Sequence, residues 1–420
     1  MMSDFNPQSP TILYGQGDRL KVLRLILSSL DQPDQAYSIF HIAGTNGKGS
    51  TSTMLQALLV GHHLRVGLFT SPHLNSECES IQVNGQQISE GDYIACQQKI
   101  AQSVLALGLD PDQDLSQFEW TFLIAMVYFR QCQCSWVVLE CGVGGELDAT
   151  NAISHAEYAI FTKIGLDHLN LLGPDLQTIA ATKAGIIRPH TRVVIAPNQP
   201  PQVRGVLNDR IQVRQAILVD SHGLQVDHRQ VRLADGTSFK VDLGLKGTYQ
   251  DENLTTVLTA YQDWLAGRGE ALEIQRINQA LKSVSLPGRY ELVQDQPVVL
   301  LDGAHNLDAI QELCLSLGED FSGQRLAIVC GFLQDKDVRH IVEKIGQLPA
   351  DFYLTQPDFP GRAMPVQQLQ ALFEEVGIPA LAFEDPNQAV DQALASGLDP
   401  VVVMGSFHLI KRVRRRWVHG

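Results

Sequence analysis

The sequence predicts an α/β protein of two domains, and three observations support this. Short apolar runs alternate with amphipathic helical stretches through most of the 420 residues, which is typical of parallel strands joined by helical crossovers. Near residues 210–245 the pattern changes to an alternation in twos, as in antiparallel strands. A second α/β series begins after residue 297. Hydrophobic residues make up 44% of the chain, which is enough to fill large cores.

In the first series, buried strands are expected where the apolar runs are richest in β-branched residues. These runs are residues 37–43, 65–69, 135–140, 157–162 and 191–196. Helical periodicity predicts helices over residues 54–61, 118–130, 175–187, 250–266 and 271–283. The alternating stretch holds Asp235-Gly236, a typical hairpin turn, so we expect a small antiparallel sheet at about 210–245.

The second series starts with the apolar run "VVLLDGAHN" and repeats a strand-and-helix pattern. Its strands are expected near residues 298–302, 326–331, 351–355, 380–383 and 400–406. We therefore expect an N-terminal α/β domain at residues 1–288, with a mostly parallel sheet and the small antiparallel sheet. A linker at 289–297 and a smaller, Rossmann-like C-terminal α/β domain at 298–420 would follow.

Composition narrows the class of protein. The formal charge is −14, which disfavours a general nucleic-acid binder, and the basic run "KRVRRR" at 411–416 is expected to be a solvated last helical turn. Seven scattered cysteines give neither a closed disulfide framework nor a zinc spacing. No signal peptide or membrane-spanning run is recognised. We expect a cytoplasmic protein, monomeric for lack of any assembly signal, without nucleic-acid or membrane partners.

Residues 41–53, "HIAGTNGKGSTST", join an expected strand to an expected helix through a glycine-rich loop. In that setting backbone N–H groups and a helix N-terminus hold phosphate, with Lys48 reaching the outer phosphates and Ser50 or Thr51 facing Mg²⁺. A plain strand-to-helix turn is the alternative, which three glycines around a lysine disfavour. The expected ATP-binding residues here are Gly44, Thr45, Asn46, Gly47, Lys48, Gly49, Ser50 and Thr51. The domain at residues 1–288 is therefore expected to be a P-loop ATPase domain.

Polar side chains also follow three other expected strands. Glu140 ends "WVVLE", Ser71 follows "RVGLF", and His168 lies in the loop after "AIFT". Ligands bind at the carboxyl edge of open α/β sheets, and phosphoryl transfer needs cations with hard oxygen ligands. These strand ends should therefore converge beside the phosphate loop. Taken alone, His168 would be a loop histidine with its hydrogen bonds satisfied.

The short loop "GTNGKGS" at 44–50 resembles that of the Mur ligase superfamily, and most closely that of folylpolyglutamate synthases and bifunctional dihydrofolate synthases. An ordered set of further motifs is similar to that family over nearly the whole chain. The set comprises "TSPHL" at 70–74, "FE" at 118–119, "LECGVGGELDATN" at 139–151, "IGLDHLNLLG" at 164–173, "KAGI" at 183–186, "YQDENL" at 249–254, "PGRYE" at 287–291, "DGAHN" at 302–306 and "GSFHLI" at 405–410.

The resemblance implies roles for single residues. It implies that Ser71, Glu140 and His168 hold Mg²⁺, and that Lys183 is carbamylated by CO₂ and helps to bind a second Mg²⁺. The carbamylation is chemically sensible, because a lysine near cations and out of water has a lowered pKa, and the product is an anionic oxygen donor. The alternative for Lys183 is an ordinary surface lysine in a helix. With Lys48, these make Lys48, Glu140, His168 and Lys183 the expected catalytic group.

The same resemblance supplies the remaining contacts. Further ATP contacts are expected at Asn253, Arg289, Asp302 and His305, although His305 could equally cap the next helix. For the pterin substrate, the implied residues are Asp18, Arg19, Phe118, Glu119, Leu147, Asp148 and Ala149. Phe118 could instead be a core residue. Two departures concern this half of the site: Glu146 and Ser80 stand where the family often has Arg.

Enzymes of this family join glutamate to a pterin acid at the expense of ATP, through an acyl phosphate. The resemblance thus implies a ligase that adds L-glutamate to dihydropteroate, to tetrahydrofolate, or to both, with ATP, two Mg²⁺ ions and a carbamate on Lys183. No Cys/His or Ser/His/Asp set competes, and such catalysis needs mostly positioning and charge stabilisation. The alternatives are another Mur-type ligase acting on a cell-wall nucleotide and, in a different class, a non-catalytic ATP-binding switch.

Overall fold

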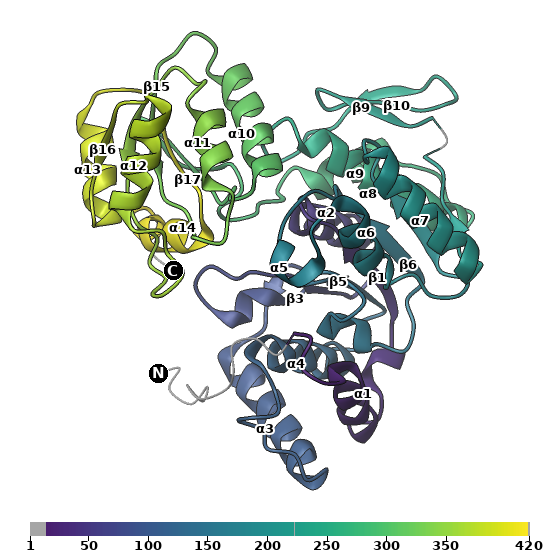
Figure 1. The fold of residues 1–420 in the computed structure, drawn as a ribbon. Helices are drawn as coiled ribbons and strands as arrows, with labels where there is room; N and C mark the ends of the chain where they lie inside the picture. The colour runs from purple at the N-terminus through teal and green to yellow at the C-terminus, as the bar shows by residue number, and fades with distance from the viewer. Residues whose placement is uncertain (1–13, 222, 419–420) are drawn as a thin grey trace. The chain divides into compact units, whose positions relative to one another are not determined.

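The computed structural model describes residues 14–221 and 223–418, in two compact units (Figure 1). Unit 1 holds the described residues up to Leu243 together with Asp251–Val284. Unit 2 holds Gly244–Gln250 together with Ser285 and the described residues after it. Both units are α/β, as the sequence predicts.

Unit 1 is built on a mostly parallel sheet, which within the described residues has eight strands in the order β4-β3-β2-β5-β1-β6-β7-β8. Only β3 and β4 pair antiparallel to their neighbours. The strands are β1 (Ser38–Ala43), β2 (Val66–Phe69), β3 (Ile81–Val83), β4 (Gln86–Gln87), β5 (Trp136–Glu140), β6 (Tyr158–Phe161), β7 (Arg192–Ile195) and β8 (Ile217–Leu218). The chain leaves β1 in one direction to β2 and later returns past it to β6, so the loop after β1 lies where the strand order reverses. Open α/β sheets bind ligands at such a point.

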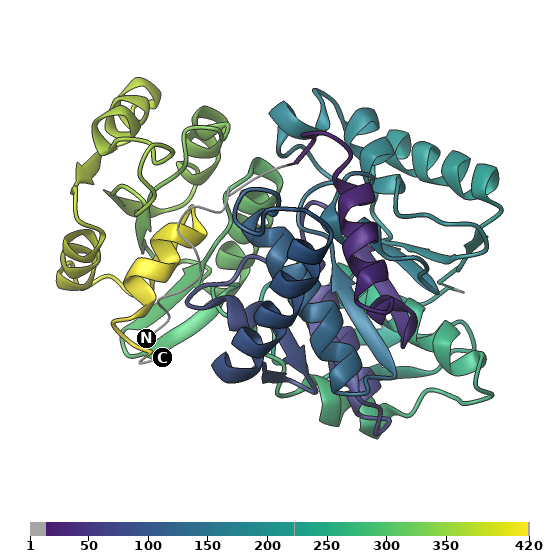
Figure 2. The ribbon, with the colours of Figure 1, turned by 90° about the horizontal axis from the view of Figure 1, so that it is seen from below.

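The helices of unit 1 cover both faces of this sheet (Figures 1 and 2). They are α1 (Arg19–Ser29), α2 (Lys48–Val60), α3 (Glu90–Ala106), α4 (Gln117–Gln131), α5 (Leu169–Leu172), α6 (Leu176–Ala184), α7 (Pro201–Arg214), α8 (Gln250–Ala266, which starts at the last residue of the first segment of unit 2) and α9 (Ile274–Leu281). Short 3₁₀ turns are η1 (Pro33–Gln35), η2 (Glu77–Ser80) and η3 (Ala149–Ala152).

The two faces of the sheet bury different side chains. Alternate residues of each strand, such as Val137 and Phe161, point to one face and pack against α1, α3, α4, α6 and α7. On the opposite face, Phe40 stacks between Trp136 and Tyr158, and Trp136 meets Trp264 of α8. Burial on both faces explains why the strands read as continuous apolar runs rather than as alternating ones.

The small antiparallel sheet is shorter than the sequence suggests. It consists of β9 (Gln225–Asp227), β10 (Gln230–Arg232) and β11 (Ser238–Lys240), with the expected hairpin turn at Asp235-Gly236. Residues 210–214, which were expected in this sheet, instead end helix α7. This helix starts with Pro201 and buries Val203, Leu207 and Ile211, four residues apart, so its helical period outweighs the local alternation.

Unit 2 has a six-stranded sheet within the described residues, in the order β12-β13-β17-β14-β15-β16. Its strands are β12 (Glu291–Asp295), β13 (Val298–Asp302), β14 (Leu326–Cys330), β15 (Ala350–Leu354), β16 (Ala380–Ala382) and β17 (Val401–Met404). Its helices are α10 (Leu307–Asp320), α11 (Val338–Ile345), α12 (Val366–Val376), α13 (Pro386–Ala395) and α14 (Phe407–Arg414). Helices α10, α11 and α12 bury one face of the sheet.

The segment 289–297, expected to be a linker, carries strand β12. It pairs antiparallel with β13 in the register Glu291↔Leu301 to Asp295↔Val298. Pro287, Gly288 and Pro297 suggested a break between domains. Pro287 and Gly288 instead precede strand β12, and Pro297 lies in the turn between β12 and β13. Unit 2 also takes in Gly244–Gln250, because Thr248 and Tyr249 contact Ser316 and Asp302 there.

Candidate active site

The glycine-rich loop lies between β1 and α2, as expected, and its glycines are required by close contacts. Gly47 caps α2 with φ +86°, and a β-carbon there would lie 2.2 Å from Asn253 Oδ1. A β-carbon at Gly44 would lie 1.8 Å from Thr162 Oγ1. A side chain at either position would force its neighbour to shift, and at Gly47 the positive φ would add backbone strain. Asn253, expected to contact ATP, lies directly beside it.

Backbone hydrogen bonds hold this loop to the end of β6. The N–H groups of Thr45 and Asn46 both donate to Lys163 O, at 2.8 and 3.1 Å. The Thr45 hydroxyl donates to Gly165 O at 3.0 Å and accepts from the N–H of Gly165 at 3.1 Å. No sequence pattern indicates that Thr162 and Lys163 contact this loop, because main-chain anchoring leaves no residue-type signal.

Two lysine side chains meet at one carbonyl oxygen of the loop. Lys183 Nζ donates to Gly44 O at 2.8 Å, and Lys48 Nζ donates to Gly44 O and Thr45 O at 3.2 Å. Lys183 lies on α6 and is buried, so it is no surface lysine. Burial, followed by the charge of Lys48, lowers the pKa of Lys183 to about 7. Near neutral pH a large share of this amine is therefore uncharged and nucleophilic.

The expected metal ligands lie at the same sheet edge. Glu140 ends β5 opposite Ile42 in the parallel register, two residues before Gly44, and it is buried. Ser71 lies two residues beyond β2, which pairs with β5 on its other side. His168 follows β6 and starts α5 with φ +51°. The register thus brings these three strand ends to one edge, beside the phosphate loop (Figure 1).

These residues fit a phosphate and a divalent cation. The Thr51 hydroxyl is buried and, among the described residues, has no hydrogen-bond partner. A buried hydroxyl without a partner destabilises the folded protein unless a ligand or a water molecule forms a hydrogen bond with it. No three His, Cys, Asp or Glu side chains of the described residues cluster as a metal site. The expected set differs from such a cluster, since it combines one glutamate and one histidine with serine and lysine.

The residues expected to bind the pterin are largely engaged within the protein. Arg19 makes two hydrogen bonds of 2.9 Å with Glu119, and Glu119 also closes the capping box of α4 with Ser116. Phe118 packs on Phe69 with ring centroids 5.7 Å apart. Asp18 caps α1 by accepting from the N–H of Lys21. The structure thus brings Arg19 and Glu119 together, as an ion pair.

The loop after β5 rests on a buried polar network. Asp148 accepts from the N–H groups of Val143 and Thr150, and the Thr150 hydroxyl contacts both Asp148 and His41. Burial raises the pKa of Asp148, against these hydrogen bonds, which lower it. Its neighbour Leu147 is exposed and Ala149 is buried. Within this expected trio, only Leu147 offers its side chain freely to a ligand.

The two departures from the family pattern have different surroundings. Glu146 is exposed at the tip of the loop after β5, whereas Ser80 is buried. The guanidinium of Arg188 donates to the carbonyl oxygens of Asn151, Ile153 and Ile186, so backbone groups already occupy it.

The expected ATP contacts of unit 2 gather at the end of β13. Asp302 is buried, accepts from the N–H groups of Tyr290 and Ala304, and has its pKa raised by burial, against the charge of Arg289. The Arg289 guanidinium lies 4.3 Å from the ring centroid of Phe407, and the ring of His305 lies 6.2 Å from it. Asn306, rather than His305, caps α10.

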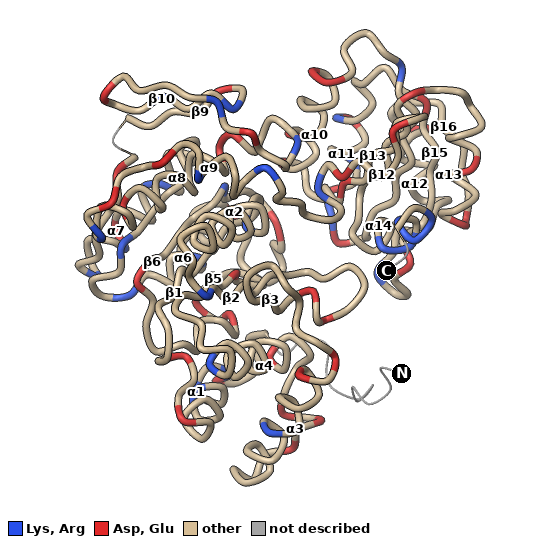
Figure 3. The backbone as a smooth tube through the Cα atoms, turned by 180° about the vertical axis from the view of Figure 1, so that it is seen from behind, with Lys and Arg blue, Asp and Glu red and all other residues tan. Residues whose placement is uncertain are grey.

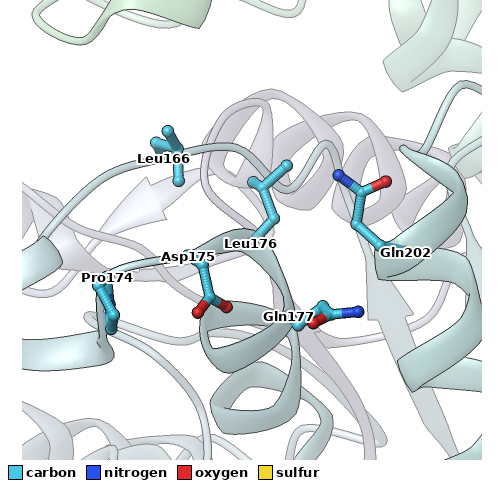
Figure 4. A pocket seen from close by; sticks show the side chains of 6 residues that line it. All are labelled: Leu166, Pro174, Asp175, Leu176, Gln177 and Gln202. Carbon is cyan, nitrogen blue, oxygen red and sulfur yellow. The ribbon is translucent and has the colours of Figure 1, made fainter.

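A separate hollow of about 430 Å³ lies on unit 1 beside α6 (Figure 4). It is lined by Leu166, Pro174, Asp175, Leu176, Gln177 and Gln202, none of which belongs to the expected site. Over the whole chain, acidic and basic positions are interspersed, and the blue stretch at α14 marks the basic run (Figure 3). Among the described residues, no helix is long and apolar enough to cross a bilayer.

The sequence and the structure were compared with those of known proteins, and both match one family. The family model described as the Mur ligase middle domain matches residues 42–261, and that described as the Mur ligase, glutamate ligase domain matches residues 288–407. A curated Escherichia coli protein named dihydrofolate synthase/folylpolyglutamate synthase is 32% identical, over 97% of this chain and 92% of that one. The chain belongs to this family of Mur ligases.

Solved structures of similar proteins have the same fold. One is a Mycobacterium tuberculosis folylpolyglutamate synthase complexed with ADP and AMPPCP, with a TM-score of 0.86, 30% identity and 96% of each chain covered. Another is a bifunctional folylpolyglutamate synthase/dihydrofolate synthase with Mn, AMPPNP and L-glutamate bound, with a TM-score of 0.81, 29% identity, and coverage of 94% of this Mur ligase and 93% of that chain. The expected family and fold class are thereby confirmed.

Proposed function

We propose that this Mur ligase uses ATP to join L-glutamate to dihydropteroate and also to tetrahydrofolate. The observation that carries the proposal is the phosphate loop with Lys48 and Lys183 on a single carbonyl, at the sheet edge where Glu140 ends β5. This arrangement suits the transfer of a phosphoryl group. The names of the relatives supply the substrate class, since they combine both glutamate-adding activities.

The reaction follows from acyl-group chemistry. A carboxylate oxygen of the pterin acid attacks the terminal phosphorus of ATP, and the bond between that phosphorus and the bridging oxygen breaks. ADP departs, and an acyl phosphate of the pterin acid remains. The neutral amine of glutamate then attacks the acyl carbon to give a tetrahedral intermediate. Its collapse expels inorganic phosphate, the amine loses a proton, and an amide remains. No side chain needs to act as a nucleophile, so positioning and charge stabilisation suffice.

The chain contributes donors and ligands to these steps. The N–H groups at the start of α2 face the phosphates, and Lys48 turns from its own loop to the transferred group. Mg²⁺, when bound, would offset the charge of the phosphates, and Ser71, Glu140, His168 and Thr51 are the residues that would hold it. Asn253, Arg289, Asp302 and His305 are proposed as the remaining nucleotide contacts, and units 1 and 2 as the two functional domains, with β12 in the second.

Lys183 is proposed to carry a carbamate. Its neutral amine adds to CO₂, a C–N bond forms, and one proton leaves to solvent, giving an anionic group that would ligate a second Mg²⁺. The pKa of about 7, caused first by burial, supports this proposal because it makes the neutral amine available. Native mass spectrometry of the intact protein at saturating bicarbonate tests it: a 44-dalton adduct is expected that Lys183→Arg lacks, and its absence from the wild-type protein, or an equal adduct on both proteins, would contradict a carbamate on Lys183.

One assay tests the overall function. Purified protein is supplied with ATP, Mg²⁺ and labelled glutamate, and with dihydropteroate, tetrahydrofolate or a muramyl nucleotide in turn. We expect ADP and an amide product with both pterins and none with the muramyl nucleotide. Lys48→Ala and Glu140→Ala should each abolish turnover, whereas the exposed Lys99→Ala should not. Product from the muramyl nucleotide alone would show that the protein is a cell-wall ligase instead.

A further inference from the structure

The side chain of Lys163 lies beside the glycine-rich loop, and the mechanism above does not use it. The main-chain oxygen of Lys163 anchors this loop by accepting from the N–H groups of Thr45 and Asn46. Its side chain reaches toward helix α8, where the ammonium nitrogen lies 3.8 Å from Glu252 Oε2. A positive charge is therefore held next to the loop that is proposed to bind the phosphates of ATP.

The ammonium of Lys163 is available to a ligand. The side chain is 31% exposed, and among the described residues it makes no hydrogen bond, since 3.8 Å is beyond hydrogen-bonding distance. By contrast, the amine of Lys48 donates to two loop carbonyls at 3.2 Å. A loose, partly exposed ion pair contributes little to stability, so Lys163 can exchange Glu252 for another anion at small cost.

Glu252 places a negative charge at the same point. It lies in the first turn of α8, one residue before Asn253, whose Oδ1 would be 2.2 Å from a β-carbon at Gly47. Glu252 Oε1 is buried and has no hydrogen-bond partner among the described residues. A carboxylate so close to the start of α2 repels phosphate groups unless a cation lies between them. Among the described residues, Lys163 supplies the one ion pair of Glu252.

The proposed chemistry also leaves the loop short of positive charge. Lys183 would become an anion once it carries the carbamate, and Lys48 would then be the remaining lysine that donates to the loop. Lys163 lies two residues beyond the last residue of β6, at the carboxyl edge of the sheet, where the loop also lies. An ammonium at this position can form a charge-assisted hydrogen bond with a phosphate oxygen.

We infer that Lys163 is a further nucleotide-contacting residue, whose ammonium turns from Glu252 to a phosphate group of the bound nucleotide. This inference rests on the proposed function and deepens it. In the free protein, Glu252 keeps the ammonium beside the loop. The main chain of Lys163, which anchors the loop, and its side chain, which contacts the phosphate, thus serve the same site.

Lys163→Met tests the inference, because it removes the charge and leaves the main-chain anchor of the loop intact. Binding of ADP in the presence of Mg²⁺, measured by calorimetry, should weaken by about tenfold, the range of one lost charge-assisted hydrogen bond. Lys163→Arg keeps the charge and should restore most of the affinity. Without nucleotide, the melting temperature of both variants should stay near that of the wild-type protein, because the lost ion pair is loose.

Glu252→Gln distinguishes a phosphate contact from a purely structural ion pair. It breaks the same pair but frees the ammonium, so ADP should bind as tightly as to the wild-type protein or more tightly. Equal weakening by Glu252→Gln and Lys163→Met would show that the pair serves only the fold, and would overturn the inference. Lys282→Met is the control for loss of a lysine charge, because its 3.5 Å pair with Asp242 is exposed. It should bind ADP as before.

Two further outcomes overturn the inference. One is unchanged ADP binding by Lys163→Met, and the other is an equal loss of ADP binding by Lys282→Met, which would show a general effect of net charge. The wild-type protein is measured first. If it binds no ADP, the proposed function itself has failed, which is distinct from failure of the Lys163 variant alone.

Discussion

The ATP half and the pterin half of the proposed site in unit 1 are built in different ways. In the ATP half, Gly44 and Gly47 leave no free space for a side chain, and the amines of Lys48 and Lys183 donate to loop carbonyls. In the pterin half, Arg19, Glu119 and Asp148 are fixed by ion pairs and caps. In the proposed site, phosphate recognition therefore depends on backbone geometry, whereas the pterin side is left with few unengaged side chains, of which Leu147 is exposed.

The largest expected effect concerns Lys183. Lys183→Ala removes both the donor to Gly44 O and the carbamate, so we expect kcat to fall by about a thousandfold or more, a loss on the scale of a deleted charge-stabilising group. The exposed helical Lys99→Ala serves as control and should retain full activity. Steady-state kinetics measure both variants. Near-normal turnover by Lys183→Ala would show that Lys183 takes no part in catalysis.

The next effect tests whether Arg19 and Glu119 are structural. Their side chains are 14% and 6% exposed, so Glu119→Gln or Arg19→Met should lower the free energy of unfolding by about 3 kcal/mol, because a buried charge loses its partner. Urea unfolding measures this loss. Arg339→Met breaks a pair of similar length, 2.8 Å, that is more than half exposed, and it should cost little. Full stability with lost pterin binding would instead make Arg19 a ligand contact.

A smaller effect is expected from the loop glycine. Gly47→Ala places a methyl group against Asn253 at a positive φ, whereas Gly85→Ala has a similar φ of +77° and open space around it. Both should lose about 1 kcal/mol of stability from backbone strain, but only Gly47→Ala should raise the KM for ATP, by about tenfold or more. Equal KM values for ATP in the two variants would show that the glycine-rich loop does not bind ATP.

The smallest effect is a pH dependence of the carbamate. Because burial places the pKa of Lys183 near 7, well below the ordinary 10.5, the amine is mostly charged below pH 7 and mostly neutral above it. With ¹³C-bicarbonate held at constant dissolved CO₂, the carbamate signal in ¹³C NMR should grow as the pH rises from about 6 to 8. Lys183→Arg should show no such signal. No carbamate signal anywhere in this range would contradict the lowered pKa, because an amine with the ordinary pKa of 10.5 stays charged there.

Much of the fold and the position of the glycine-rich loop were predictable from the sequence, because both depend on local patterns. The apolar runs indicated the central strands, and the glycine spacing indicated a loop whose close contacts the structure then explains. Residues 210–214 were misread, since five residues of alternation cannot show the helix that begins at Pro201. The contacts of Thr162 and Lys163 with this loop could not be predicted, because they join residues that are distant in sequence.

The shared carbonyl of Gly44 has a consequence for how nucleotide is received. Its oxygen accepts hydrogen bonds from two lysine amines, that of Lys48 in the loop itself and that of Lys183 in α6. These two hydrogen bonds brace the loop in a fixed shape from inside. An arriving phosphate therefore has little chain to order, so less of its binding energy is lost to entropy.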